Sequence, residues 1–286
     1  DILVDLAGHT GGNRLDVFAR RAAPVQVTWL GYPDTTGLET MDYRLVDAIS
    51  DPPGTSDKLA SATLIRLPRG FIVGVPQLDA PPVGVPPIYR NGHATFGSFN
   101  NLAKVNRSVI ALWARLLHAV PDARLLLKSS FSSDEWVHHR FRRAFADAGI
   151  GPERLGFRIR TAKHADHLAL YGEVDIALDP FPYNGTMTTL EGLSMGVPLI
   201  ALEGRSHVSR VSASLLAQVG HPEWVAADED DYIVKAAALA KDKSRLATLR
   251  MRLRDEYLAS SLADAPGLAL AIEAAYRDMW RKWCEG

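Results

Sequence analysis

From residue 94 onward, short apolar segments alternate with longer segments in which apolar residues recur every three or four positions. The short segments are typical of buried strands and the longer ones of amphipathic helices. The pattern predicts strands at 94–99, 124–128, 157–160, 175–178 and 198–202. It predicts helices at 108–120, 135–148, 164–173, 186–195 and 209–219. Strands separated by helices of this length form a parallel, doubly wound α/β sheet, which binds ligands at the carboxyl ends of its strands.

The chain before residue 94 has a weaker pattern. A strand at 2–6, a short helix through Phe18 and Arg21, and a strand at 25–30 together predict a βαβ element. Prolines and glycines cluster at 52–54 and at 79–87, and we interpret the segment that they bracket as the boundary between two lobes. The sequence thus predicts a first lobe at 1–92 and a second lobe at 93–262.

The end of the chain is predicted to be helical. Leu268 to Trp283 form an amphipathic helix, in which Tyr276, Trp280 and Trp283 recur at three- and four-residue spacing and so share one face. We expect the segment 263–286 to pack back on the lobes through these aromatic side chains. A dimer contact through the same face is the alternative.

Composition and charge exclude several classes of function. The chain has 286 residues, 47% of them hydrophobic, with 32 Lys and Arg against 33 Asp and Glu, for a net charge of -1. This balance provides no general field for nucleic acid or an anionic membrane, and no apolar run reaches membrane-spanning length. The only cysteine is Cys284, which is consistent with a cytoplasmic protein. The chain opens on a strand without a methionine, so we expect it to be a piece of a longer protein.

The segment 179–198 carries the strongest chemical signal. It joins the end of a predicted strand to the start of a predicted helix, and its early prolines force the chain to turn. Thr186 and Thr188 place hydroxyl groups beside the N–H groups of the first helical turn, where phosphate is favoured. Glu191 lies three residues beyond Thr188, and its carboxylate suits the hydroxyls of a ribose. The alternative is a threonine N-cap with Glu191 as its capping partner, and the local pattern leaves both interpretations open.

Other polar loops follow the predicted strands of the second lobe, at 100–104, 128–130 and 161–167. Lys104 can reach a diphosphate as a point charge, and the ring of His167 can stack on a base. A solvated lysine and a half-buried surface histidine are the alternatives. Parallel topology would bring these loops to one edge of the sheet, which favours one nucleotide site. In the first lobe, His9 is a base by residue type, and it shares a loop with Arg14.

Metal and cofactor chemistry lack support. His164 and His167 are three residues apart, but no cysteine or cluster of carboxylates completes a ligand set at a usual spacing. No Walker-type phosphate loop and no GxSxG nucleophile motif occur in the sequence. We therefore expect neither a metal nor a cofactor.

Several motifs match a known family in order along nearly the whole chain. They are Ala23 to Gly37 with Met41 to Tyr43, Phe99 to Lys104, Leu178 to Gly185 with Thr188, and Arg210 to Ser214. Together they resemble the catalytic region of O-linked N-acetylglucosamine transferases. The resemblance implies a GT-B fold with two Rossmann-like lobes, the first truncated at its amino end, and tetratricopeptide repeats upstream. It also implies metal-independent, inverting transfer of a sugar from UDP-GlcNAc to Ser or Thr of proteins.

The resemblance assigns roles by position. Lys104 is implied to bind the diphosphate and stabilise the leaving UDP, with Thr188 on a phosphate and Glu191 on the ribose. The remaining donor residues are Asn101 in place of a family glutamine, Ala162 meeting uracil through its backbone, His164, the base-stacking His167, Thr186 and Met187. The sugar pocket is implied to contain Leu30, Gly31, Pro33 and Tyr183, with His9 and Arg14 as possible acceptor-side residues.

Departures from the family pattern concern the donor. The animal enzymes have His-Thr-Thr where this chain has Thr186, Met187 and Thr188, and His164 replaces a lysine. A long insertion between the lobes is absent, as in bacterial members. The alternatives are therefore GDP-fucose transfer to Ser or Thr, UDP-hexose transfer to Asn, or a catalytically silent nucleotide-sugar-binding module. The family's active-site histidines are expected upstream of residue 1, so we expect this piece to be inactive alone.

Overall fold

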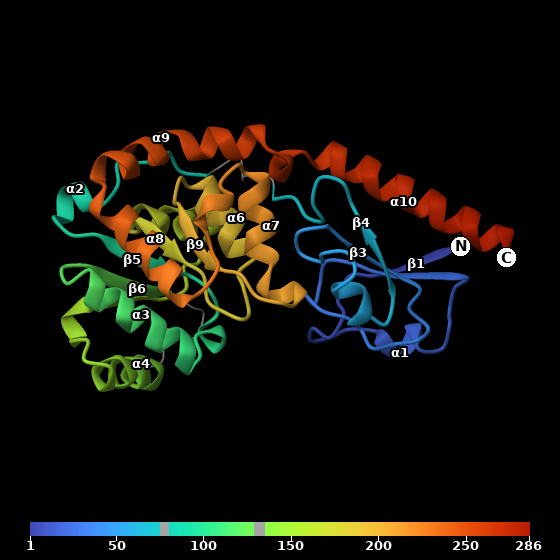
Figure 1. Ribbon diagram of the computed structural model, residues 1–286, viewed down its shortest axis with the longest axis horizontal. Helices are drawn as coiled ribbons and strands as arrows, with labels where there is room; N and C mark the ends of the chain where they lie inside the picture. Colours follow the sequence, from blue (N-terminus) through green and yellow to red (C-terminus); the bar gives the residue numbers. More distant parts are fainter. Residues whose placement is uncertain (75–79, 129–134) are drawn as a thin grey trace.

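The computed structural model describes residues 1–74, 80–128 and 135–286, and it contains two parallel sheets side by side (Figure 1). The first sheet has the strand order β1-β2-β3-β4, and the second has the order β10-β9-β8-β5-β6-β7. The strands of the first sheet are β1 (Ile2–Asp5), β2 (Val25–Thr28), β3 (Tyr43–Val46) and β4 (Thr63–Arg66). Those of the second are β5 (Thr95–Ser98), β6 (Arg124–Lys128), β7 (Leu155–Arg158), β8 (Ile176–Leu178), β9 (Leu199–Leu202) and β10 (Val225–Ala226).

The first sheet contains the predicted βαβ element and two strands that the pattern missed. Strand β1 pairs in parallel with β2, Ile2 opposite Val25, and α1 (Leu15–Phe18) lies between them in the chain. Strands β3 and β4 are four residues each and lie among proline- and glycine-rich loops. Four residues are too few for an apolar period to stand out, so the pattern could not distinguish these strands from loop.

The second sheet follows the predicted alternation closely. Its helices are α2 (Ile88–Asn91), α3 (Arg107–Ala119), α4 (Glu135–Asp147), α5 (His164–Ala169), α6 (Met187–Ser194), α7 (Val211–Gln218), α8 (Glu229–Lys241) and α9 (Lys243–Ala259). Two predictions were wrong in detail. Strand β7 begins at the buried Leu155 and ends before the exposed Ile159, and the helix predicted at 164–173 tightens into a 3-10 turn from Leu170.

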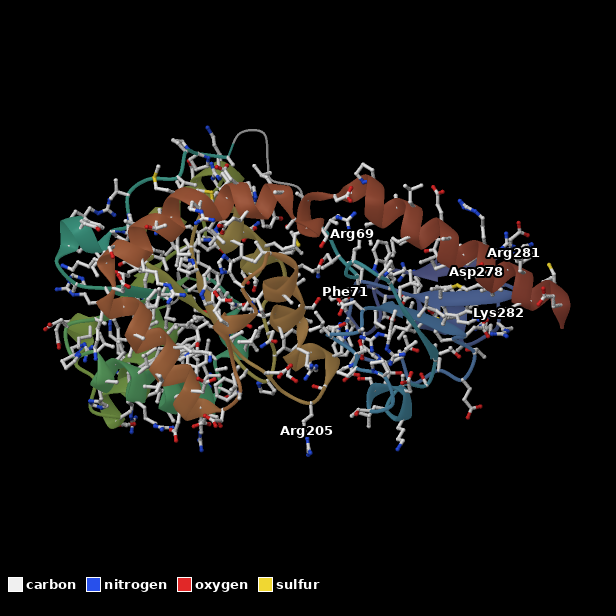
Figure 2. The ribbon with its side chains drawn as sticks, turned by 45° about the horizontal axis from the view of Figure 1, so that its top comes forward. Arg69, Phe71, Arg205, Asp278, Arg281 and Lys282 are labelled. Carbon is white, nitrogen blue, oxygen red and sulfur yellow. The ribbon has the colours of Figure 1, made fainter. Side chains whose placement is uncertain are left out.

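The final helix, α10 (Ala265–Glu285), crosses from the second lobe to the first and ends near the first residues of the chain (Figure 1). Met279 is 1% exposed and packs with Val25, Val27 and Leu45 of the first sheet, together with the partly buried Trp280. The helix α10 therefore packs on the first sheet. Asp278 and Arg281 pair along the solvent side of α10 (Figure 2).

The prediction for Trp283 was wrong. Its side chain is 50% exposed and stacks on Trp280, with the ring centroids 4.9 Å apart, instead of reaching the sheet. The reason is geometric, because α10 extends beyond the edge of the first sheet before it ends (Figure 1). No helix in the described part of the chain is both long and apolar enough to span a membrane.

Buried polar contacts join the two lobes. His207 Nδ1 lies 2.5 Å from Asp51 Oδ2, and Ser214 donates a hydrogen bond to Asp47 Oδ2 across 2.6 Å. The ring of Phe71, which lies at the junction in Figure 2, meets the His207 ring edge-on at 5.1 Å. The two sheets occupy residues 2–66 and 95–226, whereas the lobe boundaries after 92 and 262 stay predictions.

Candidate functional site

The turn between β8 and α6 is held by its own buried polar groups. Asp179 Oδ1 accepts a hydrogen bond from the Gly185 backbone N–H at 2.7 Å, and the Asn184 amide donates to the Pro180 carbonyl at 3.2 Å. Helix α6 then begins at Met187, and its N-cap residue Thr186 makes no side-chain capping bond. The N–H groups of the first turn of a helix have no intrahelical partner, so this turn presents them to an anion.

The capping interpretation of Thr188 and Glu191 was wrong. Thr188 Oγ1 donates to Asn100 Oδ1 at 3.0 Å, and Glu191 Oε2 lies 2.9 Å from His167 Nε2. Tyr171 donates to the same carboxylate oxygen at 3.3 Å. Both side chains therefore turn away from the start of their own helix toward neighbouring loops. If they capped the helix instead, the polar groups of Asn100, His167 and Tyr171 would lose these hydrogen-bond partners.

Lys104 reaches the turn from the loop after β5. Its Nζ donates to the Asn184 carbonyl at 2.7 Å and lies 4.0 Å from the centroid of the Tyr183 ring. Burial lowers the pKa of Lys104, while the nearby Asp179 carboxyl opposes that shift. Asn101 accepts from the Ala103 N–H at 3.0 Å and so caps the turn that carries Lys104.

Asp179 lies beneath this turn at the end of β8. Its side chain is fully buried, and burial raises its pKa to about 7 although the Gly185 N–H and the Lys104 charge act in the opposite direction. Its second oxygen has no hydrogen-bond partner among the described residues. Asp179 therefore holds the turn through Oδ1 in a place where burial favours its protonated form.

His167 lies between a cation and an anion. Lys128 Nζ is 2.7 Å from His167 Nδ1, and Glu191 Oε2 is 2.9 Å from Nε2. An ammonium group can only donate, so Nδ1 must accept and Nε2 must carry the proton that Glu191 accepts. Burial lowers the pKa of Lys128, with the Glu191 charge opposing it. The ring is thus held in one neutral tautomer.

Aromatic rings surround His167. The centroids of Phe99 and Tyr171 lie 6.0 and 5.7 Å from that of His167, and they lie 4.6 Å from each other. The His164 ring is exposed at the start of α5, 5.8 Å from His167. Ala162 is exposed two residues earlier, and Met187 is 55% exposed at the start of α6. These three residues border the cluster without bonding into it.

The first lobe contributes the loop after β2. Leu30 has a φ of 76°, and a Cβ added at Gly31 would lie 2.5 Å from the Leu6 carbonyl oxygen, so only glycine fits there. Burial and then the nearby Tyr32 phenol raise the pKa of Tyr183, and Tyr32 directly follows Gly31 in this loop. The first lobe therefore meets the turn near Lys104.

The two acceptor-side candidates are held by their own lobe. His9 Nε2 lies 3.0 Å from the Thr36 carbonyl, and its ring meets Tyr32 edge-on at 5.3 Å. Arg14 donates to the carbonyls of Gly12 and Asn13 on its own loop. His9 therefore lies beside the junction of the lobes, whereas Arg14 is turned back on its loop.

Four polar residues of the cluster were not chosen from the sequence. Asn100, Lys128 and Asp179 lie in segments that the sequence singled out at the ends of predicted strands, but no individual role was assigned to them. Tyr171 has no such signal. Ser129 and Ser130, which belong to the predicted 128–130 loop, lie outside the described residues. Among the residues described, no group of three or more His, Cys, Asp or Glu side chains could hold a metal ion.

Two lobes of parallel strands, with a phosphate-ready helix start in the second lobe facing a glycine loop of the first, define a glycosyltransferase of the GT-B type. The family model of glycosyl transferase family 41 matches residues 1–78 and 89–269, and the chain belongs to this family. The resemblance seen in the motifs is thereby confirmed.

Individual relatives agree with the family. The Arabidopsis thaliana protein named Probable UDP-N-acetylglucosamine-peptide N-acetylglucosaminyltransferase SPINDLY is 45% identical over 286 residues, which are 100% of this chain and 31% of that protein. A second Arabidopsis thaliana relative has the same name with SEC in place of SPINDLY. It is 30% identical over 298 residues, which cover 100% of this chain and 30% of that protein. A mutant O-GlcNAc transferase of Thermobaculum terrenum has a TM-score of 0.93 and 40% identity, covering 100% of this chain and 54% of that chain. The chain thus spans about a third of the curated relatives.

Proposed function

We propose that this chain carries the donor site of a protein O-GlcNAc transferase, which moves a sugar from UDP-GlcNAc to Ser or Thr hydroxyls of proteins. The observation that carries the proposal is the convergence of Lys104, Thr188 and the Lys128–His167–Glu191 series on one turn. These groups match the parts of one nucleotide diphosphate. The names of the SPINDLY, SEC and Thermobaculum relatives support the same donor and acceptor.

In this proposal the diphosphate lies at the start of α6. Lys104 supplies the positive charge, and the first-turn N–H groups of α6 with the Thr188 hydroxyl supply hydrogen bonds. The ribose hydroxyls lie on Glu191, whose position His167 and Tyr171 fix. The base lies on the aromatic side of the cluster, against the His167 ring and the Ala162 backbone.

The reaction needs little covalent participation by the protein. The acceptor oxygen attacks the anomeric carbon from the face opposite the diphosphate, the bond to the phosphate oxygen breaks, and the configuration inverts. Lys104 and the start of α6 stabilise the negative charge that develops on the leaving UDP, a contribution of a few kcal/mol. His9 is the candidate base of the first lobe, and neither a metal nor a cofactor takes part in the proposed step.

A panel of donors tests this proposal. The full-length protein is incubated with an acceptor protein that contains Ser and Thr and with UDP-GlcNAc, GDP-fucose or a UDP-hexose. Mass spectrometry of the intact acceptor then gives the mass that was added. We expect the mass of one or more N-acetylhexosamine groups with UDP-GlcNAc only. A deoxyhexose mass would assign the chain to fucose transfer, and donor binding without any mass change would make it a silent binding module.

The exposed Met187 is the reason for including other donors. A methionine at this position offers no hydroxyl to the phosphate or sugar, unlike the threonine of the animal pattern. Met187→Thr in the same panel shows whether this position selects the donor. A changed ratio of products between UDP-GlcNAc and GDP-fucose identifies Met187 as a specificity residue.

A further inference from the structure

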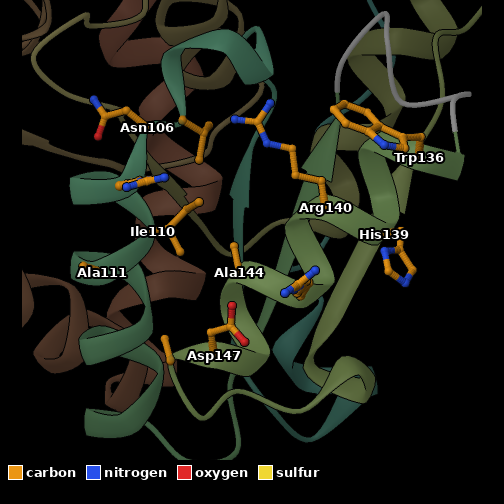
Figure 3. A pocket seen from close by; sticks show the side chains of 12 residues that line it. Asn106, Ile110, Ala111, Trp136, His139, Arg140, Ala144 and Asp147 are labelled. Atoms are coloured by element: carbon orange, nitrogen blue, oxygen red, sulfur yellow. The ribbon is translucent and has the colours of Figure 1, made fainter.

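A second concave site lies outside the donor site, between α3 and α4 (Figure 3). Its volume is about 640 Å³. We call it the basic groove and define it by Arg107, Ile110, Trp136, Arg140, Arg143 and Ala144. Figure 3 shows Ile110 of α3 and Ala144 of α4 facing one another, with Arg140 extending from α4 toward α3. The groove therefore has an apolar floor and a cationic rim.

The helical period of α4 builds the rim. Trp136, Arg140, Arg143 and Asp147 follow one another at four-, three- and four-residue spacing, so they share one face of the helix. Phe141 and Phe145 are buried one turn apart, and they anchor the opposite face of α4 in the core. The arginine face is consequently fixed in direction by the packing of the core.

The arginines of the groove form no ion pair within the described part of the chain, and the Arg140 guanidinium lies 5.9 Å from the centroid of the Trp136 ring. Among the described residues, no carboxylate pairs with Arg107, Arg140 or Arg143, whereas Arg158 and Arg210 on the same lobe hold Glu173 and Glu203. Of the residues that the structure describes, one carboxylate, Asp147, lines the groove. Three guanidinium groups against one carboxylate give this groove a positive charge on a chain whose net charge is -1.

The groove lies directly beside the donor turn. Asn106, which lines the groove at the start of α3, donates a hydrogen bond to the Phe181 carbonyl at 2.9 Å. Phe181 belongs to the turn that precedes the helix of Thr188. A polypeptide held in the groove would therefore lie next to the donor-binding turn.

We propose that the basic groove binds an acidic segment of a partner polypeptide. Guanidinium groups bind carboxylates through paired N–H donors, which suits Asp and Glu side chains spaced along an extended chain. The floor of Ile110 and Ala144 accepts an apolar side chain between them. Single-stranded RNA fits less well, because it needs a series of aromatic platforms for its bases, and the described lining offers the rings of Trp136 and His139 alone.

The proposal is tested by fluorescence anisotropy with the full-length protein. The probe is a short labelled peptide of Glu, Asp and Leu, and a peptide with Lys in place of the acids serves as the charge-reversed control. We expect saturable binding of the acidic peptide only. The double variant Arg140→Glu with Arg143→Glu should weaken that binding about tenfold or more.

A matched variant separates the groove from general charge. Arg142→Glu reverses one charge on the same helix, as each half of the double variant does, but the Arg142 side chain lies over the Phe157 ring, 5.2 Å from its centroid, and does not line the groove. It should leave the affinity within about twofold. Thermal melting confirms that each variant is folded, and Arg140→Gln with Arg143→Gln replaces the double reversal if that variant melts early.

Three results would overturn the proposal. They are an equal loss of binding in Arg142→Glu and the double variant, no binding of the acidic peptide, and tighter binding of an oligouridylate than of the peptide. The assay contains no nucleotide and no acceptor, so its outcome is independent of the donor-site proposal. UDP affinity measured on the same double variant should be unchanged.

Discussion

The Lys128 ammonium lies 2.7 Å from Nδ1 of His167, and this contact determines which ring nitrogen carries the proton. Nδ1 is an acceptor, so Nε2–H points at Glu191. The lysine side chain is 7% exposed at the end of β6. The position of Glu191, and with it the proposed ribose contact, therefore depends on a buried cation from a neighbouring strand.

Replacing that cation should release the ring. In Lys128→Met we expect His167 to populate both neutral tautomers, and UDP affinity to fall by about 1 kcal/mol, the contribution of one hydrogen bond. Nitrogen-15 NMR of the His167 ring reports the tautomer, and calorimetry reports the affinity. Lys241→Met, on the exposed residue at the end of α8, is the control and should change neither. An Nε2–H tautomer that persists in Lys128→Met contradicts this account.

Asp179 predicts a dependence of stability on pH. Its pKa is raised by burial to about 7 in the folded protein, against an ordinary value of 3.8. Between these values the folded state holds a proton that the unfolded state has lost, so the free energy of unfolding falls as the pH rises through this window. Asp179→Asn keeps an oxygen for the Gly185 N–H and removes the titration.

Urea unfolding at a series of pH values measures this effect. The variant should show a flatter decline than the wild type between about pH 4 and pH 7, because only the wild type must lose that bound proton. Parallel curves for the two proteins would show that Asp179 is ionised throughout.

The contact between the lobes predicts a stability loss. Burial alone would raise the pKa of Asp51, but the hydrogen bond from His207 and the charges of His207 and Arg44 hold it below its ordinary value. His207→Ala leaves a buried carboxylate without this partner and should cost about 2–4 kcal/mol at neutral pH. The cost should shrink as the pH falls through the pKa of folded Asp51, because the stabilising charge is then lost.

Chemical unfolding of His207→Ala at neutral and acid pH measures both effects. Arg281→Ala, which removes an exposed ion pair on α10, is the control and should have little effect at either pH. If His207→Ala lowered the free energy of unfolding no more than the control does, the contact between Asp51 and His207 would not stabilise the junction of the lobes.

The docking of α10 predicts a difference between two methionines. Met279→Ala removes a side chain that is 1% exposed and should cost about 2–4 kcal/mol through the cavity that it leaves. Met251→Ala on α9, where the side chain is 74% exposed, should stay within about 0.5 kcal/mol. Thermal unfolding followed by circular dichroism compares the two, and equal losses would contradict docking through Met279.

The second lobe could be predicted from the sequence because its strands are buried on both faces. The strand Arg124–Lys128, for example, has the continuous apolar run Leu125 to Leu127 at its centre. Fewer strands of the first lobe could be predicted, because β3 and β4 have four residues each and show no clear apolar period. The strand β10 was missed because it has two residues, Val225 and Ala226.

The site could be predicted in part for a similar reason. Lys104, Thr188 and Glu191 follow strands whose carboxyl ends meet at one edge, so topology alone brings them together. The choice between cap and ligand site for Thr188 could not be made locally. Its partner Asn100 is 88 residues away in the chain, and Tyr171, which orients Glu191, is 20 residues from it. Such partners become visible only in the folded protein.

The central claim is that Lys104 binds the diphosphate of a nucleotide at the start of α6. Calorimetric titration of the full-length protein with UDP, for the wild type and for Lys104→Met, tests it most directly. We expect the variant to lose about tenfold to a hundredfold in affinity, as for a charge-assisted hydrogen bond, while Lys58→Met on the first lobe binds as the wild type does. Equal affinity of the wild type and Lys104→Met for UDP would contradict the claim.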